Sequence, residues 1–478
     1  MLDKTLTPTP ARASYYNIGP EDIKMRAAEL PGLTGVMVED LFPGIDPPVP
    51  RVSEATYKED IRRRTRETLA KVNLEKIQPG DSVNILTSHH GYSIYGGEAY
   101  VEMIKTIHDE IQRRSGATDI RLRAGVGLRF RETEEYIAKF GLNEFFKGKA
   151  RGIAPVDKGV PIETDIGRLY GIAKAYDARW IIHAHNNDVR ELHYHRQMGR
   201  LFKPFAMSYA TIETRSSYHQ SMGPRAANIL PRMIFESDFI QEKFVCSCML
   251  QVGTQGVMGI DASEDLVAQD KNFARLNLKW YGKIVTLLSS LKDVVLLIDY
   301  PGPIPYTTSG GILFGNFLNA TVDEFDLTES FTPFTRYTDM LYPDVNPLVP
   351  DKLKPPNPAI KALIINYCSK GYPGTFFAQQ IPTLVIGKQA DLFANDEQNV
   401  NFMDFAVKVE SLEKAIGFAS KFSGTDKLLA FDGAVGGFNV SRGLAEEMFA
   451  LAPGISKEVD EELMPKWLKQ RGIEPLAA

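Results

Sequence analysis

Apolar and polar positions in the first two hundred residues follow two periods, a short one typical of strands and a longer one typical of helices. Short apolar runs predict strands at 81–87, 118–126, 150–156 and 178–185. Helical spacing of apolar or charged residues predicts helices at 54–74, 98–114, 133–140 and 166–176. Because strands and helices alternate in this way, we expect right-handed crossovers and a mostly parallel sheet.

The second half of the chain repeats this pattern around the apolar run DVVLLID at 293–299. Further strands are predicted at 362–367, 382–386, 403–409 and 428–431, and helices at 411–422 and 441–451. The predicted fold class is therefore α/β, with two α/β domains and mostly parallel sheets. The first domain is expected at 1–280 and the second at 281–440, with the tail at 441–478 free to return to the first.

Composition narrows the range of partners. Of 478 residues, 44% are hydrophobic and 24% are charged, which is ordinary for a globular protein. The net charge of -5 argues against a nucleic-acid partner, because phosphate binding needs a basic face, but it leaves room for a local basic pocket that captures a small anion. No apolar run reaches the roughly 18 residues of a membrane span, no secretory signal is visible, and three cysteines make no disulfide framework. We therefore expect a cytoplasmic protein with no membrane partner.

Histidine is distributed unevenly. All eight histidines lie between positions 89 and 219: His89, His90, His108, His183, His185, His193, His195 and His219. Imidazole titrates near neutral pH and ligates metals, so the pattern places the chemistry in the first half of the chain.

Polar residues follow three of the predicted strands. The segments are SHHGY at 88–92, GVGLRFRE at 125–132 and HAHNND at 183–188. Ligands of open α/β sheets bind outside the carboxyl ends of the strands, so these segments are expected to line one pocket. Arginine forks match carboxylates, which makes a small acid the expected substrate. The predicted substrate-binding residues are Ser88, His89, Tyr92, Arg129, Arg131 and Arg200.

The spacing of the histidines limits how they can act. His183 and His185 are two apart on a predicted strand and point to one face, which suits either metal ligation or a general base with a partner. His193 and His195 are predicted to follow a helix cap at Asp188, and on a helix they lie about 200° apart. That angle argues against a cage of four histidines and leaves two or three imidazoles with open positions.

Several segments resemble the nickel-pincer lactate racemase family. The resemblance runs weakly from about 60 to 440 and rests on GLRFRETEEY at 127–136, on Gly199, Arg200 and Pro204, on SYATI at 208–212 followed by His219, and on the strand–helix–strand run at 407–437. In that alignment the family's motif histidine falls on Arg129, and its cofactor-bearing lysine falls on Arg200, with Lys203 nearby but out of register. The covalent nickel-pincer nucleotide is therefore not expected, because a guanidinium is a poor acyl acceptor.

The resemblance implies an isomerase, a racemase or epimerase of a 2-hydroxy acid or sugar acid. The expected catalytic residues are His90, His185 and His193, and His183, His195 and His219 are candidate ligands of a divalent metal, nickel or zinc. The expected partner is the small anionic hydroxy acid or sugar acid, and a homo-oligomer is compatible with the sequence. Two alternatives remain open: a metal-dependent lyase, hydratase or hydrolase on the same fold, and a non-catalytic binding homologue.

Overall fold

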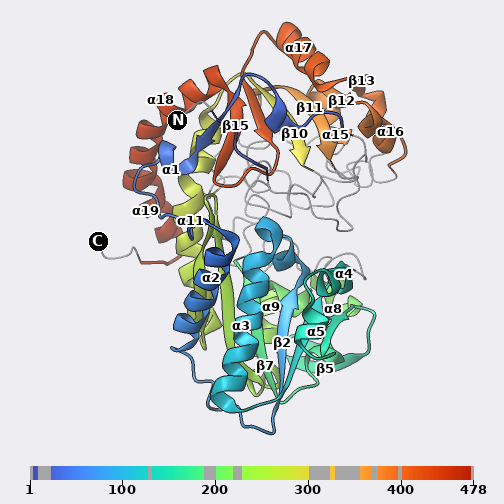
Figure 1. The fold of residues 1–478 in the computed structure, drawn as a ribbon, viewed down its shortest axis with the longest axis vertical. Coiled ribbons are helices and arrows are strands. Elements are labelled where there is room, and N and C mark those ends of the chain that lie inside the picture. Colours follow the sequence, from blue (N-terminus) through green and yellow to red (C-terminus); the bar gives the residue numbers. More distant parts are fainter. Residues whose placement is uncertain are drawn as a thin grey trace.

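The computed structural model describes residues 4–8, 23–126, 132–187, 201–218, 229–300, 323, 325–328, 356–368, 375–396 and 401–474. These residues form a six-stranded sheet, a seven-stranded sheet and a two-stranded ribbon, with helices packed on the sheets (Figure 1). The predicted α/β class with mostly parallel strands is confirmed.

The first sheet has the strand order β4-β3-β2-β7-β8-β9. Its strands are β2 (Ser82–Ser88), β3 (Asp119–Gly125), β4 (Ala150–Ile153), β7 (Trp180–Asn186), β8 (Phe244–Gly253) and β9 (Gly256–Ser263). The first five pair in parallel, and β9 turns back antiparallel to β8. The carboxyl ends of β2, β3 and β7 therefore meet at one edge of the sheet.

Two long helices cover one face of this sheet (Figure 1). They are α2 (Glu54–Leu69), capped by the Ser53 side chain, and α3 (Glu98–Ser115). The apolar stripe of α3, including Ile104, Ile107 and Ile111, is fully buried, as its helical period requires. The opposite face is covered by short elements, among them α7 (Lys203–Ala206), α8 (Ile212–Ser216), α9 (Ile229–Glu236) and α10 (Asp238–Gln241).

The helix predicted at 166–176 is wrong. The chain forms a ribbon of β5 (Gly159–Thr164) and β6 (Gly167–Ile172), followed by one turn of 3-10 helix at Ala173–Ala175. Leu169 is buried and Tyr170 is exposed, which is the alternation of a strand. A Cβ atom on Gly171 would lie 2.4 Å from the Tyr176 ring, so the close packing of this ribbon requires glycine.

The second sheet has the order β1-β15-β14-β10-β11-β12-β13. Its strands are β1 (Leu33–Met37), β10 (Val294–Tyr300), β11 (Ile360–Cys368), β12 (Thr383–Ile386), β13 (Ala406–Val409), β14 (Leu428–Phe431) and β15 (Gly437–Ser441). β10 to β14 pair in parallel, whereas β15 and β1 are antiparallel. The N-terminal strand β1 thus joins the sheet built by the second half of the chain.

The long helix α11 (Leu266–Ser290) leads from the first sheet to the second (Figure 1). The C-terminal helix α18 (Arg442–Glu458) packs against α11, β1 and β15, so it lies on the second sheet. The remaining helices are α1 (Val38–Leu41), α4 (Glu132–Lys139), α5 (Leu142–Phe145), α15 (Thr375–Gln380), α16 (Lys388–Ala394), α17 (Leu412–Ser423) and α19 (Met464–Gln470). In the described part of the chain, none of the helices has the length and apolar character needed to cross a bilayer.

Candidate functional site

The ends of β2 and β7 bring three histidines to one edge of the first sheet. The two strands are parallel neighbours, with Leu86 beside His183. Two residues further on, β2 runs into a short 3-10 helix that begins at His89, and β7 reaches His185. We call the edge formed by His89, His90 and His185 the histidine edge.

His89 and His90 lie against each other. The His89 side chain is buried, His90 is half-buried, and their ring centroids are 3.4 Å apart at an angle of 48°. A short helix that begins directly at the strand end holds both rings close to the backbone, so neither depends on a long loop for its position.

His183 is held on both sides of its ring. Its Nε2–H donates to the Leu201 carbonyl at 3.0 Å, and its Nδ1 accepts from the Tyr209 hydroxyl at 3.0 Å. Complete burial, reinforced by His185, lowers the pKa of His183 well below its ordinary value, so the ring is neutral. With both nitrogens engaged, His183 has no lone pair to offer, which argues against its expected role as a metal ligand.

His185 lies at the mouth of the sheet. Its side chain is buried, and its Nδ1 accepts from the backbone N–H of Asn186 at 2.6 Å. In the neutral ring this bond places the proton on Nε2. The His185 ring packs in a T-shaped arrangement against the His183 ring, with 5.6 Å between the ring centroids. His183, which is fixed by its own hydrogen bonds, therefore supports the position of His185.

Tyr92, expected to bind substrate, lies in the core. Its ring is fully buried, stacked on Tyr136 and against the edge of Tyr100, and its hydroxyl is 2.9 Å from the Thr87 hydroxyl. Burial raises the pKa of Tyr92 far above its ordinary value. The aromatic side chain of the SHHGY segment thus supports the fold beneath the histidine edge.

Two buried oxygen atoms at this edge have no hydrogen-bond partner among the residues that the structure describes. They are Oγ of Ser88, at the end of β2, and Oδ1 of Asn186, at the end of β7. Leaving a buried polar atom unpaired costs about 1–3 kcal/mol, so native proteins rarely do so without reason. The neighbouring Asn187, by contrast, is bonded to Val252 and Asn277.

A buried arginine that the sequence analysis missed lies beside the end of β3. Arg215 of α8 donates to the carbonyls of Val126 at 2.9 Å and Ala210 at 3.2 Å. Burial lowers its pKa to about 10, so it stays charged at neutral pH. Its position follows from the close approach of 208–212 to the end of β3, where a Cβ on Gly125 would lie 2.3 Å from the Ser208 carbonyl oxygen. In the sequence, this contact is indicated only by Gly125 at the end of the predicted strand and by the presence of Arg215 further along the chain.

The other expected site residues, Arg129, Arg131, His193, His195, Arg200 and His219, lie outside the described residues. Lys203, at the start of α7, is buried. Across the ranges that the structure describes, no three His, Cys, Asp or Glu side chains gather as a metal-binding group. Nickel or zinc binding and the absence of a covalent nucleotide both stay predictions.

Comparison with known proteins adds no family to this picture. The chain matches no protein-family model, and a search of curated proteins returns no significant relative.

Proposed function

We propose that this protein is an isomerase that inverts the carbon next to the carboxylate of a 2-hydroxy acid or sugar acid at the histidine edge. One observation carries the proposal: imidazoles from two adjacent parallel strand ends lie at the same edge as two buried oxygen atoms that have no hydrogen-bond partner among the described residues. This is where α/β sheets bind ligands, and such oxygens suit a hydroxyl-bearing substrate.

The reaction needs one group on each face of the substrate's C2. One neutral imidazole, His185 or His90, takes the C2 proton and leaves an enediolate. A protonated imidazole on the other face then returns a proton to C2, which yields the opposite configuration with no net change in protons. Ser88 and Asn186 would hydrogen-bond the 2-hydroxyl group, Arg129, Arg131 and Arg200 would hold the carboxylate, and His193 is a further candidate for the second face.

Arg215 fits this scheme as a positioning residue. It binds the Val126 carbonyl, directly before the 127–131 segment that carries Arg129 and Arg131. A metal, if bound, would supply Lewis-acid or redox chemistry through His195 or His219, since both ring nitrogens of His183 are already engaged.

Proton exchange in D₂O tests the proposal directly. The full chain is incubated with a panel of 2-hydroxy acids and sugar acids, and NMR follows the C2 proton while chiral chromatography follows configuration. We expect deuterium at C2 together with interconversion for at least one acid. Vinylic products would instead indicate a lyase or hydratase, and a panel that binds without exchange would indicate a non-catalytic protein; either result overturns the proposal.

Metal content and cofactor attachment are measured on the same sample. Elemental analysis of protein purified without added metal, and again after incubation with nickel or zinc, reports the metal. Intact mass reports any covalent nucleotide, and a nucleotide-sized adduct on Lys203 would contradict the expectation from Arg200.

A further inference from the structure

The edge of the first sheet formed by β3 and β4 carries a second concentration of charge. Two arginines, Arg121 and Arg123, alternate with buried apolar residues on β3, so both project from one face. On the neighbouring strand β4, Arg151 lies directly beside Arg123 in the parallel register. Three guanidinium groups therefore share a small area of one sheet face.

These side chains line a cavity of about 370 Å³. Its charged lining consists of five cations and two carboxylates, a formal charge of +3: Arg121, Arg123, Lys149, Arg151 and Lys174 with Asp119 and Asp177. We call this cavity the arginine pocket. Its volume is within the range of small-molecule sites, about 300–1,000 Å³.

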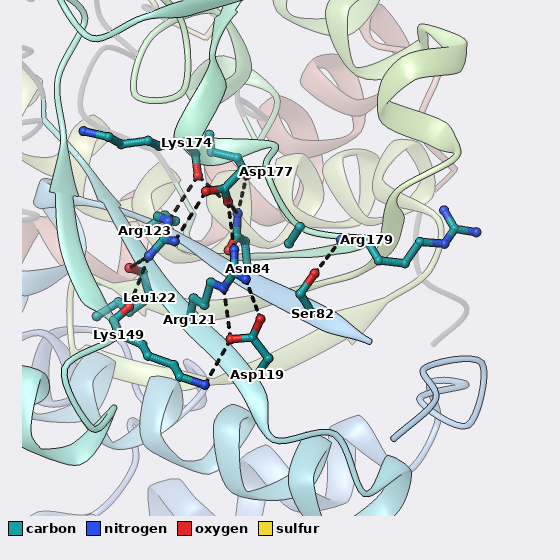
Figure 2. Close-up of polar contacts among 12 residues, drawn as sticks. Ser82, Asn84, Asp119, Arg121, Leu122, Arg123, Lys149, Lys174, Asp177 and Arg179 are labelled. Atoms are coloured by element: carbon teal, nitrogen blue, oxygen red, sulfur yellow. Dashed lines mark hydrogen bonds and ion pairs between the residues drawn. The ribbon is translucent and has the colours of Figure 1, made fainter. Parts of the chain in front are cut away.

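Part of the charge serves the fold. Figure 2 shows Arg123 donating to main-chain carbonyls, at 3.1 Å for both Lys174 and Lys149, and Asp119 accepting from Arg121 and Lys149. Asp177 accepts from Asn84 at 2.8 Å and lies 3.5 Å and 3.6 Å from the two β3 arginines. These contacts orient the donors and fix the walls of the pocket.

Two other cations of the pocket, Arg151 and Lys174, do not hold its walls in this way. Arg151 is exposed and has neither an ion-pair nor a hydrogen-bond partner within the described ranges. The Lys174 side chain is 54% exposed, and among the described residues its ammonium group pairs only with Asp157, at 3.7 Å. Burial, together with the charges of Arg121 and Arg151 and against that of Asp177, lowers the pKa of Arg123. The cations therefore repel one another, and a multivalent anion between them would relieve that repulsion.

We propose that the arginine pocket binds a small phosphorylated metabolite, at a site separate from the histidine edge. A phosphate ester carries a charge of about −1.5 to −2 and three acceptor oxygens, which matches several converging donors better than a single carboxylate does. Arginine forks bind phosphate through paired hydrogen bonds, and Arg151 is the donor left for the ligand.

Calorimetric titration of the full chain with inorganic pyrophosphate tests the proposal, at an ionic strength of about 0.1 M, where longer-range attraction is screened. We expect saturable binding that Arg151→Ala weakens about tenfold, since the variant removes the charged hydrogen-bond donor that is left for the ligand. The matched control is Arg168→Ala, which removes another exposed strand arginine, one that pairs with Glu163 outside the pocket. This control should bind pyrophosphate as the unaltered chain does.

Three results would overturn the proposal: no saturable binding, equal affinity in Arg151→Ala, or tighter binding of citrate than of pyrophosphate, which would assign the pocket to polycarboxylates. Hydrogen exchange of the backbone at 148–151 locates the ligand, and protection elsewhere alone would also count against the pocket. A His185→Gln variant should bind pyrophosphate normally, so failure of the proposed isomerase and failure of this site are distinguishable.

Discussion

The carboxyl ends of the two sheets occupy equivalent positions and use their polar residues differently. At the first sheet, His89, His90 and His185 lie at the strand ends that also carry Ser88 and Asn186, whose buried oxygens have no partner in the described part of the chain. At the second sheet, β10 and β14 are parallel neighbours, with Ile298 beside Phe431, so the next residues, Asp299 and Asp432, lie side by side. Both carboxylates are buried.

The carboxylates of the second sheet are used to fasten other parts of the chain. Asp299 accepts from Arg26 Nε at 2.9 Å, from the Ala27 backbone at 2.6 Å and from Asn366 at 2.8 Å. Asp432 accepts from Asn439 at 2.6 Å and from the Ala434 backbone at 3.0 Å. These bonds tie the N-terminal segment and β15 to the parallel strands.

A polar strand end is therefore not by itself evidence of an active site. What separates the two ends is unused hydrogen-bonding capacity: the second sheet consumes its acceptors internally, whereas the first retains buried oxygens without partners among the described residues. Changes at the first end should alter activity more than stability, and changes at the second should do the reverse.

The largest effect is expected for His185→Gln. Removing a general acid or base typically lowers turnover by 10²- to 10⁴-fold, whereas the thermal midpoint should change little. Turnover is measured on the acid identified by deuterium exchange. His108→Gln is the matched control, because His108 lies on α3 beside Phe145 and Phe146 and should leave turnover unchanged. A His185→Gln protein with near-normal turnover, or one that is inactive only because it unfolds, would break the contrast.

Asp299→Ala should produce the opposite pattern. It strips Arg26, Ala27 and Asn366 of their shared acceptor, and breaking a buried pair of this kind costs about 3 kcal/mol. Urea unfolding measures the loss, and Asp299→Asn, which keeps an acceptor oxygen, should lose less. Turnover per folded molecule should stay unchanged; a specific loss of turnover would show that the second sheet contributes to the site.

Acid should change the folding stability in opposite directions through His183 of the first sheet and Asp299 of the second. Folded His183 is neutral, whereas the unfolded chain binds a proton there below about pH 6.5, so acid favours unfolding. Burial raises the pKa of Asp299 to about 6, despite the opposing charge of Arg26, so the folded state takes up a proton first and acid favours folding there.

Variants separate these contributions. Between pH 7.5 and 5.5, the free energy of unfolding of the unaltered chain should fall relative to that of His183→Gln, by on the order of 1 kcal/mol. Over the same range, the free energy of unfolding of the unaltered chain should rise relative to that of Asp299→Asn, by no more than about 1 kcal/mol. Urea titrations at both pH values give these differences, and a difference between the unaltered chain and His183→Gln that does not change with pH would mean that His183 has the same pKa in the folded and unfolded chain.

The smallest expected effect is a difference in the free energy of unfolding between Ser88→Ala and Asn439→Ala, which each remove one buried polar group. Ser88→Ala removes a hydroxyl without a described partner, so the free energy of unfolding should stay the same or rise by up to about 1 kcal/mol. Asn439→Ala removes the bond to Asp432 and should lower it by about 1–2 kcal/mol. A clear loss of stability in Ser88→Ala would place Ser88 among the structural groups.

The sequence by itself determined the elements with strong local periods. The strands at 81–87 and 293–299 and the helix at 98–114 agree with β2, β10 and α3 to within a residue or so, because each has a clear local pattern of apolar residues. It also placed His89, His90 and His185 at one edge, since parallel strands share the direction of their carboxyl ends. The helix predicted at 166–176 failed because Leu169, Ile172 and Tyr176 have a helical spacing, whereas the alternation that marks the strand is confined to 168–171.

Only the tertiary structure decided how each polar residue is used. His183 and His185 are indistinguishable in sequence, yet Tyr209 and the Leu201 carbonyl engage both nitrogens of His183. Likewise Arg215 donates to the Val126 carbonyl, 89 positions away in the sequence. Strand β1, near the N-terminus, pairs with β15, near the C-terminus. Such partners are set by packing between distant segments, and a local pattern holds no information about which distant group will fill a hydrogen bond.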